Sequence, residues 1–291
     1  MVIDGKWIDD DEKYRNPTGG AFVRAESVWR DTITSDGSSG FKAEPDRYHL
    51  FLAPSCPWAH RTQLVRRLKG LEDVISITLS DLPRITSRAY TQGIDELQPG
   101  QNGKLELHDV YIAADPNYTG RVTVPTLWDR NEKTIVNNES SEIVRMLNTE
   151  FDEWATKDLP DLYPEATRQE IDALNERIYE TVNNGVYRCG FAKTQEAYEE
   201  YITPMFETLD FLEELLAKKR YLVAGHPTEA DWRLFVTLIR FDFVYFSHFK
   251  CNIRRIQDYP NLWNYTLELY QTPGLSEIID IDGIKLSLIH I

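Results

Sequence analysis

Residues 51–61 read Phe51-Leu-Ala-Pro-Ser-Cys-Pro-Trp-Ala-His-Arg61, and they predict three structural steps in close succession. An apolar strand over 48–53 ends, a short loop follows, and a helix opens at Cys56-Pro57 and runs to about Lys69. Proline suits the first helical turn because its missing N–H has no intrahelical partner there anyway. The sulfur of Cys56 is therefore expected at a helix N-terminus, where backbone N–H groups and the helix dipole favour an anion.

The position of Cys56 makes it the best candidate nucleophile in the chain. The thiolate is the reactive form, and an ordinary free thiol is only about 3% ionised at pH 7. Helix N-termini are among the environments that increase the thiolate fraction of a cysteine. An ordinary buried cysteine does not need the surrounding Pro-Trp-Ala-His-Arg context.

The composition predicts a globular protein with two domains. The chain has 291 residues, 42% of them hydrophobic, which is enough material for two cores. Its formal net charge is −15, and no block of basic residues interrupts the acidic balance. Nucleic acids and anionic membranes are therefore not expected as partners, and an anionic substrate would have to meet a local group of arginines.

The cysteines and the N-terminus point to a reducing compartment, and we expect the cytoplasm. There are three cysteines, 56, 189 and 251, far apart and odd in number, so a disulfide framework is not predicted. The first residues show no basic segment followed by an apolar one, as a secretion signal would. Cys189 and Cys251 are interpreted as packing residues. The spacing of His248 and Cys251 lacks a second pair of ligands, so no metal site is predicted.

The first half of the chain begins with a polar segment, 1–45, that predicts an extended N-terminal arm. From Arg47 the order is the strand over 48–53, the helix over 57–69 and a β-branched strand over 74–79. Residues 80–109 carry Pro, Gly and Gln without clear periodicity, and we expect an insertion loop with one helical turn.

Two short apolar runs then flank Pro125 in the segment Arg121-Val-Thr-Val-Pro-Thr-Leu-Trp128. Proline is excluded from the middle of a paired strand, so Pro125 is expected at a strand start or turn, where a cis bond after Val124 fits. A strand over 134–136 and a helix over 140–148 follow. This order of elements predicts a thioredoxin-like α/β domain over 46–149.

The second half of the chain is predicted to be all-helical. A linker without period spans 150–165, a helical substrate domain spans 166–277, and a C-terminal tail spans 278–291. Two sets of apolar residues each share a helical face: Ile171, Leu174, Ile178 and Val182, and Phe206, Leu209, Leu212 and Leu216. Thr228 stands three residues before Asp231, a spacing typical of a helix N-terminus.

Several runs of sequence resemble one family in the same order. They are Ala-Glu-Pro-Asp-Arg-Tyr-His-Leu at 43–50, Cys-Pro-Trp-Ala-His-Arg at 56–61, Ala-Asp-Pro-Asn-Tyr at 114–118, Arg-Val-Thr-Val-Pro-Thr-Leu-Trp-Asp at 121–129, Ile-Val-Asn-Asn-Glu-Ser-Ser-Glu-Ile at 135–143, Thr-Val-Asn-Asn-Gly-Val-Tyr at 181–187, Thr-Glu-Ala-Asp-Trp-Arg-Leu-Phe at 228–235 and His-Phe-Lys-Cys-Asn at 248–252. Together they resemble the Xi class of the glutathione transferase superfamily, the glutathionyl-hydroquinone reductases. The resemblance covers most of residues 40–280.

The resemblance implies a glutathione site in the first domain. Cys56 would be the thiolate that attacks sulfur. The backbone of Val124, before Pro125, would pair with the cysteinyl part of glutathione like an added strand. Glu139 would take the ammonium of the γ-glutamyl end, and Ser140 with its helix N-terminus would take the α-carboxylate.

The remaining site residues are Arg121 and two tyrosines. Arg121 is either a glutathione ligand or part of a structural ion pair. Tyr179 and Tyr187 are implied to line the hydroquinone pocket and to offer a phenol proton, and the sequence does not rank them. Eight residues apart, they lie within about 80° of each other on a helix.

The implied reaction is the glutathione-dependent reduction of S-glutathionyl-hydroquinones through a Cys56–glutathione mixed disulfide, with glutathione as co-substrate and no metal. Two alternatives stay open: an omega-like cysteine transferase acting on dehydroascorbate or thiols, and a non-catalytic glutathione-binding module. The family resemblance also implies a homodimer.

The sequence departs from the family pattern in three places. Two of these departures, the missing tryptophan and the shortened tail, favour the binding module, whereas the intact Cys56, Glu139 and Ser140 oppose it. No tryptophan lies between Trp58 and Trp128, where the family carries one that packs on glutathione. His108 stands where the family has an arginine. Ile284-Lys285 is followed by Leu-Ser-Leu-Ile-His-Ile, where the family has a His-Tyr-Tyr segment.

Overall fold

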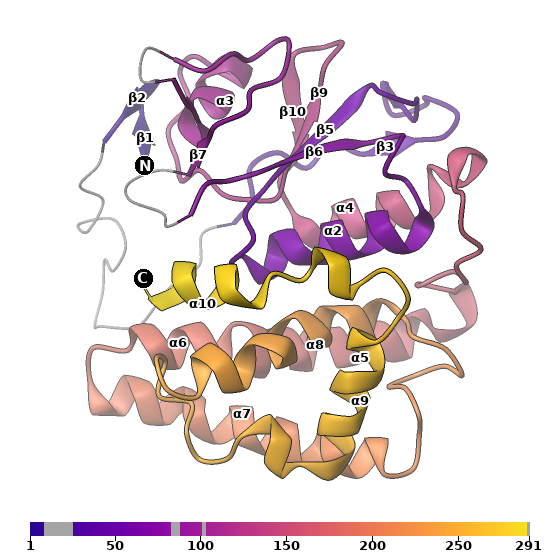
Figure 1. Ribbon diagram of the computed structural model, residues 1–291, viewed down its shortest axis with the longest axis vertical. Helices are drawn as coiled ribbons and strands as arrows, with labels where there is room; N and C mark the ends of the chain where they lie inside the picture. The colour runs from indigo at the N-terminus through magenta and orange to yellow at the C-terminus, as the bar shows by residue number, and fades with distance from the viewer. Residues whose placement is uncertain (9–25, 83–87, 101–102, 290–291) are drawn as a thin grey trace. The chain divides into compact units, whose positions relative to one another are not determined.

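The structure, a computed structural model, describes residues 1–8, 26–82, 88–100 and 103–289, so part of the predicted N-terminal arm lies outside the described residues. The chain separates into two compact units (Figure 1). Of the described residues, the first unit holds those up to Leu159 and those from Asp282 onward. The second unit holds Pro160–Ile281.

A four-stranded sheet forms the centre of the first unit, in the order β10-β9-β5-β6. Its strands are β5 (Tyr48–Leu52), β6 (Ser76–Leu79), β9 (Thr126–Asp129) and β10 (Thr134–Asn137). β5 runs parallel to β6 and antiparallel to β9, and β9 runs antiparallel to β10. All five residues of β5 are buried, as expected for a central strand covered on both faces.

Helices α2 (Pro57–Lys69) and α4 (Ser140–Thr149) pack against each other beside this sheet (Figure 1). α2 ends at Gly70, whose φ of 65° lies in the left-handed region that glycine adopts without a Cβ penalty. Glu139 is the N-cap residue of α4, and each of the two helices follows a sheet strand after a short loop. Their N-termini carry the predicted site residues Cys56, Glu139 and Ser140.

The first unit also contains three pairs of short strands. β1 (Val2–Ile3) pairs with β2 (Lys6–Trp7), β3 (Ile33–Thr34) pairs with β4 (Phe41–Lys42), and β7 (Ala89–Tyr90) pairs with β8 (Leu105–Glu106). The last pair lies within the predicted insertion loop, of which residues 83–87 and 101–102 are outside the described part.

Helix α3 (Leu107–Ala114) is longer than the single turn expected in this region. Its buried residues, Leu107, Val110 and Tyr111, have helical spacing, and Glu106 forms a capping box with Asp109. The sequence therefore carried a helix signal here, hidden by the irregular residues before it. α3 packs against β10.

The second unit is all-helical, as predicted. Its α-helices are α5 (Arg168–Ile178), α6 (Gly185–Phe191), α7 (Gln195–Leu216), α8 (Glu229–Arg240) and α9 (Pro260–Tyr270). Two π-helical turns, Tyr179–Asn183 and Phe241–Tyr245, follow α5 and α8. The predicted cap of α8 is a complete capping box between Thr228 and Asp231. A further helix, α10 (Ile281–Ile289), forms within the predicted tail, and from Asp282 onward it belongs to the first unit.

The predicted fold class is confirmed: an α/β domain with a thioredoxin-like order of elements and an all-helical domain. The Val124–Pro125 bond is cis, and Pro125 stands immediately before β9. In the described part of the chain, none of the helices is both long and apolar enough to cross a membrane.

Candidate active site

Cys56 is the N-cap residue of α2, with Pro57 in the first turn of the helix. Its backbone carbonyl accepts from the His60 N–H at 2.9 Å, which is the first bond of the helix. The residue is half-buried, so its sulfur is shielded but not sealed from solvent. The first turn of α2 contains no acidic residue that would oppose a negative charge on this sulfur.

The thiol of Cys56 faces the backbone before the cis-proline. Its Sγ atom donates to the carbonyl oxygen of Val124 at a distance of 3.5 Å. Only a protonated sulfur donates such a bond, so ionisation would release Sγ from Val124. The sequence-predicted nucleophile and the predicted backbone docking point are therefore in direct contact.

Tyr111 of α3 anchors the loop that carries Val124. Its hydroxyl donates to the carbonyl oxygen of Thr123 at 2.9 Å, and Asn138 donates to the same hydroxyl at 3.0 Å. Helix α3, of which the sequence analysis expected only one turn, thus fixes the segment opposite Cys56. The signal that could have revealed it is the helical spacing of its apolar residues.

Glu139 and Ser140 lie at the N-terminus of α4. The Oε1 atom of Glu139 accepts hydrogen bonds from the backbone N–H and the hydroxyl of Ser141 at 3.1 and 3.0 Å. Its Oε2 atom accepts from the hydroxyl of Ser27 at 3.2 Å. These contacts orient a carboxylate beside a helix N-terminus, so the same place offers a negative group for an ammonium and N–H groups for a carboxylate.

Arg61 joins the two helix N-termini. It is almost fully buried, and its Nη1 atom donates to the hydroxyl oxygen of Ser140 at 3.4 Å. Cys56 and Arg61 share α2, whereas Ser140 opens α4. The contact fixes the nucleophile's helix relative to the γ-glutamyl end of the predicted glutathione site. Sequence analysis did not identify this contact.

Arg121 is half-buried in the loop before Pro125. Its backbone carbonyl accepts from the Tyr118 hydroxyl at 2.7 Å. Its role as a glutathione ligand therefore stays a prediction.

The two predicted tyrosines belong to the second unit and have different surroundings. Tyr187 of α6 is buried, and its hydroxyl lies 3.1 Å from the hydroxyl of Tyr245. Its ring also packs edge-on against Phe249. Tyr179 is half-buried at the start of the first π-helical turn. The phenol pair of Tyr187 and Tyr245 was not predicted, because contact across 58 residues leaves no local pattern.

Tyr90 is a further residue that the sequence analysis missed. It lies on β7 in the predicted insertion loop, it is fully buried, and its ring packs edge-on against Phe51 of β5. Among the described residues its hydroxyl has no hydrogen-bond partner. Burial raises the pKa of this phenol well above its ordinary value, and the negative charge that Cys56 acquires on ionisation acts in the same direction. The phenol of Tyr90 therefore stays protonated in the folded protein.

The described residues include no group of three or more His, Cys, Asp or Glu side chains placed to hold a metal ion.

Comparison with known proteins identifies the family. The model of the glutathione S-transferase N-terminal domain matches residues 55–150, and that of the C-terminal domain matches residues 195–267. The chain is 47% identical to the glutathionyl-hydroquinone reductase YqjG of Escherichia coli, over 98% of this chain and 89% of the relative. It is 52% identical to the glutathionyl-hydroquinone reductase PcpF of Sphingobium chlorophenolicum, over 90% of this chain and 82% of the relative.

Solved structures agree. The glutathione-bound structure of YqjG matches with a TM-score of 0.84 and 43% identity, over 97% of this chain and 88% of that one. The Xi transferase of Phanerochaete chrysosporium matches with a TM-score of 0.83 and 45% identity, over 92% of this chain and 88% of that one. The chain belongs to the Xi class of glutathione transferases. The resemblance inferred from its motifs is therefore confirmed for the family and the fold, and Cys56, Val124, Glu139 and Ser140 lie in the matched N-terminal domain of this Xi-class transferase.

Proposed function

We propose that this transferase reduces S-glutathionyl-hydroquinones to hydroquinones with glutathione, through a mixed disulfide on Cys56. The observation that carries the proposal is the Cys56 thiol at the N-terminus of α2, 3.5 Å from the carbonyl oxygen of Val124. Two curated relatives of high identity are named for this reductase activity, which gives the substrate class. In this proposal glutathione is a co-substrate and the enzyme needs no metal.

Glutathione binds, in this proposal, along the first unit. Its cysteinyl backbone pairs with Val124 before Pro125, which satisfies amide groups as an added strand would. Glu139 receives the ammonium, and Ser140 with the α4 N-terminus receives the α-carboxylate. The glutathione-bound structure of YqjG supports glutathione as the ligand. Arg121 is proposed as a further contact to its anionic end.

The reaction then consists of two displacements at sulfur. The Cys56 thiolate attacks the sulfur of the glutathionyl-hydroquinone, the carbon–sulfur bond breaks, and the aromatic carbon takes the electron pair and a proton. Cys56 and glutathione are left joined by a disulfide. A second glutathione thiolate attacks this disulfide, which releases glutathione disulfide and returns Cys56 as a thiolate. The hydroquinone conjugate is reduced, and two glutathione units are oxidised.

The proton for the aromatic carbon is proposed to come from a tyrosine of the helical unit. Tyr187 is the better candidate of the two predicted tyrosines because the hydrogen bond with Tyr245 can stabilise the phenolate left after proton transfer. Tyr179 is the second candidate. We further propose a cytoplasmic homodimer, from the family and from a cysteine composition that suits a reducing compartment.

Mass spectrometry of the protein mixed with a glutathionyl-hydroquinone, without added thiol, tests the proposal. We expect one glutathione on Cys56 and one free hydroquinone per chain. The Cys56→Ser variant, which keeps the size of the side chain, should give neither product. Folded protein that binds glutathione but forms no adduct would contradict the reductase mechanism. Turnover of dehydroascorbate without turnover of quinone conjugates would support the omega-like alternative instead.

A further inference from the structure

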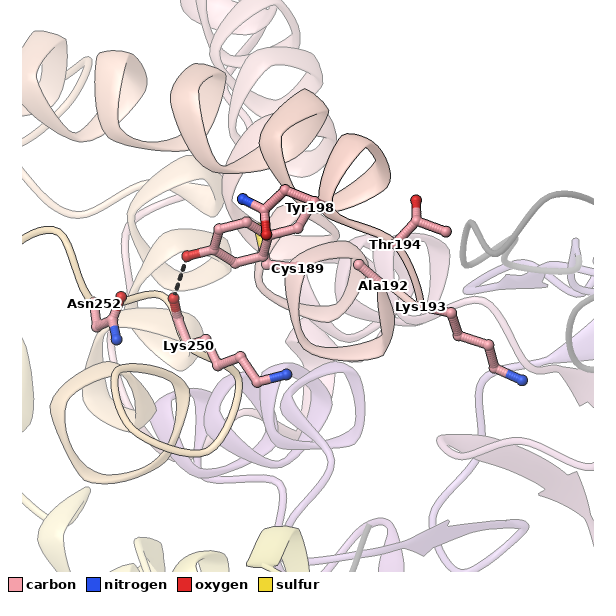
Figure 2. A pocket seen from close by; sticks show the side chains of 8 residues that line it. Cys189, Ala192, Lys193, Thr194, Tyr198, Lys250 and Asn252 are labelled. Atoms are coloured by element: carbon pink, nitrogen blue, oxygen red, sulfur yellow. Dashed lines mark hydrogen bonds between the residues drawn. The ribbon is translucent and has the colours of Figure 1, made fainter.

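The helical unit contains a second thiol site around Cys189 and Cys251. A cavity of about 430 Å³ lies beside α6 and the start of α7, with Cys189 in its wall (Figure 2). The other lining residues come from the loop and first turns of α7 and from the segment after the second π-helical turn: Ala192, Lys193, Thr194, Gln195, Tyr198, Lys250 and Asn252. The cavity therefore connects one of the two thiols with the surface.

Cys251 lies against the turn of α6 that carries Cys189. Both cysteines are buried. The Sγ atom of Cys251 donates to the carbonyl oxygen of Val186 at 3.9 Å, and Val186 precedes Cys189 by three residues, about one turn, in the same helix. Both are free thiols in this structure. A disulfide between them requires the two sulfurs to approach to about 2 Å.

Tyr198 of α7 is hydrogen-bonded to the residue before Cys251. Its hydroxyl donates to the carbonyl oxygen of Lys250 at 2.6 Å, as the dashed line in Figure 2 marks. Lys250 precedes Cys251 and has a φ of 60°, a left-handed conformation that is unfavourable for a residue with a Cβ. The hydrogen bond thus ties the strained loop before Cys251 to α7.

The rim of the cavity has the charge that an anionic small molecule requires. Lys193 and Lys250 are both exposed there, although the chain as a whole carries −15. Glutathione disulfide carries more carboxylates than ammonium groups and is negative at neutral pH. A pair of lysines beside a thiol therefore favours its approach over that of a neutral disulfide.

We propose that Cys189 and Cys251 form an oxidisable dithiol, which glutathione disulfide converts to an intramolecular disulfide. The oxidant is the product of the proposed function, but the pair itself does not need Cys56. Cys189, after losing its proton to water, attacks one sulfur of glutathione disulfide, and one glutathione leaves as a thiolate. Cys251 then attacks the mixed disulfide at the Cys189 sulfur and gives its proton to solvent, and the second glutathione leaves. Two protein thiols are oxidised, and one glutathione disulfide is reduced to two glutathiones.

The order of the two steps follows from burial. Cys189 lines the cavity, whereas Cys251 does not. Burial, with a smaller contribution from the neighbouring Cys189, raises the pKa of the Cys251 thiol well above its ordinary value, so Cys251 is the poorer first nucleophile. Because both thiols are buried, exchange should be slower than at Cys56 and limited by opening of the Tyr198 contact.

The test is peptide mapping after incubation with glutathione disulfide, alkylation of remaining thiols and digestion. The Cys56→Ser chain is used beside the unmodified chain, so a failure of the reductase proposal does not affect the result. We expect a peptide containing Cys189 linked to one containing Cys251, and none in Cys189→Ala. A stable glutathione adduct on Cys189 with Cys251 still free would overturn the pair. The proposal would also be overturned if Cys189 and Cys251 both stay unreacted in a sample of the parent chain in which glutathione disulfide has already modified Cys56.

A second pair of variants tests the access route. Tyr198→Phe removes the hydroxyl that bonds to Lys250 and should speed formation of the linked peptide about fivefold, the effect of losing one hydrogen bond on an opening equilibrium. Tyr201→Phe is the matched control, because Tyr201 lies on the same helix, with Arg188 over its ring, and should leave the rate unchanged. Equal rates in all three chains would exclude the Tyr198 contact as the barrier.

Discussion

The Nη1 atom of Arg61 donates a hydrogen bond to the hydroxyl oxygen of Ser140 at 3.4 Å, and this contact joins the helix of the nucleophile to the helix that should hold the γ-glutamyl group of glutathione. A planar, permanently charged guanidinium suits this position, because it can orient Ser140 and add positive charge close to an incoming carboxylate. Positioning across two helices matters for a reaction that needs Cys56 aligned with a bound sulfur.

Arg61→Met should therefore weaken glutathione binding more than it slows the chemical reaction of the Cys56 thiol. We expect the KM for glutathione to rise about tenfold, the cost of about 1.4 kcal/mol in binding. The rate at which iodoacetamide alkylates Cys56 in the absence of glutathione should change much less than this KM. Arg61→Lys keeps the positive charge but loses the planar guanidinium. Its KM for glutathione should lie between those of the parent chain and Arg61→Met. An unchanged KM in a folded Arg61→Met protein would contradict the positioning role.

Tyr90→Phe should have opposite effects on the stability of the free protein and on its catalytic efficiency. Its hydroxyl is buried without a partner among the described residues, so removing it should stabilise the free protein by about 1 kcal/mol in urea unfolding. If the hydroxyl bonds to bound substrate near Cys56, the same change should lower kcat/KM several-fold. A stabilised variant with unchanged kinetics would show that Tyr90 only fills the space beside Phe51.

Tyr187→Phe should slow release of hydroquinone by about 100-fold, within the range that general acids contribute. It should not affect the reaction of glutathione with a preformed Cys56 mixed disulfide, which needs no proton on carbon. Tyr179→Phe is the comparison, because the sequence did not rank the two. Stopped-flow measurement of each half-reaction distinguishes them, and equal losses in both half-reactions would point to a structural defect.

The parts of this protein that the sequence predicted have local signals. The strand, loop and proline before α2 place Cys56 at a helix N-terminus within a dozen residues, and the Thr228 and Asp231 spacing marks the start of α8 in the same way. Each signal lies inside one element, where propensity and capping act directly.

The parts that were missed depend on contacts between distant residues. The Arg61 contact to Ser140 spans 79 positions, and the Tyr187 contact to Tyr245 spans 58. Neither follows from the periodicity of one helix. Cys189 and Cys251 were interpreted as separate packing residues for the same reason, since only the packing of the segment after the second π-helical turn against α6 brings Cys251 to the helix turn that carries Cys189.

His49 of β5 should make the protein less stable in mild acid. Burial, with smaller contributions from Arg130 and Arg66, lowers the pKa of its imidazole to about 3. The folded state thus keeps His49 neutral while the unfolded chain takes up a proton near its ordinary pKa of about 6.5. The free energy of unfolding should fall as pH decreases from about 6.5 toward 3, by about 1.4 kcal/mol per pH unit from this residue at most.

His49→Gln isolates this contribution, because glutamine can still bond to the Ser76 hydroxyl, now 2.8 Å from Nδ1. The unfolding free energy of this variant, measured in urea at several pH values between 7 and 4.5, should depend less steeply on pH than that of the parent chain. The difference in slope should correspond to about one proton taken up on unfolding. Parallel slopes would mean that His49 is already protonated in the folded state.

Asp231 should be one of the costliest residues to remove from the helical unit. Its carboxylate is fully buried, Oδ2 accepts from the N–H and hydroxyl of Thr228 at 2.7 and 2.8 Å, and Oδ1 accepts from the Leu222 N–H at 3.0 Å and the Tyr265 hydroxyl at 2.9 Å. Asp231→Ala leaves these donors buried without an acceptor, and we expect a loss of about 3–5 kcal/mol in unfolding free energy. Asp231→Asn, which keeps one oxygen, should lose less. Asp258→Ala removes an exposed capping carboxylate of the same kind beside Arg255 and should have little effect, so similar losses at both sites would show that capping alone, and not burial of the donors, sets the cost.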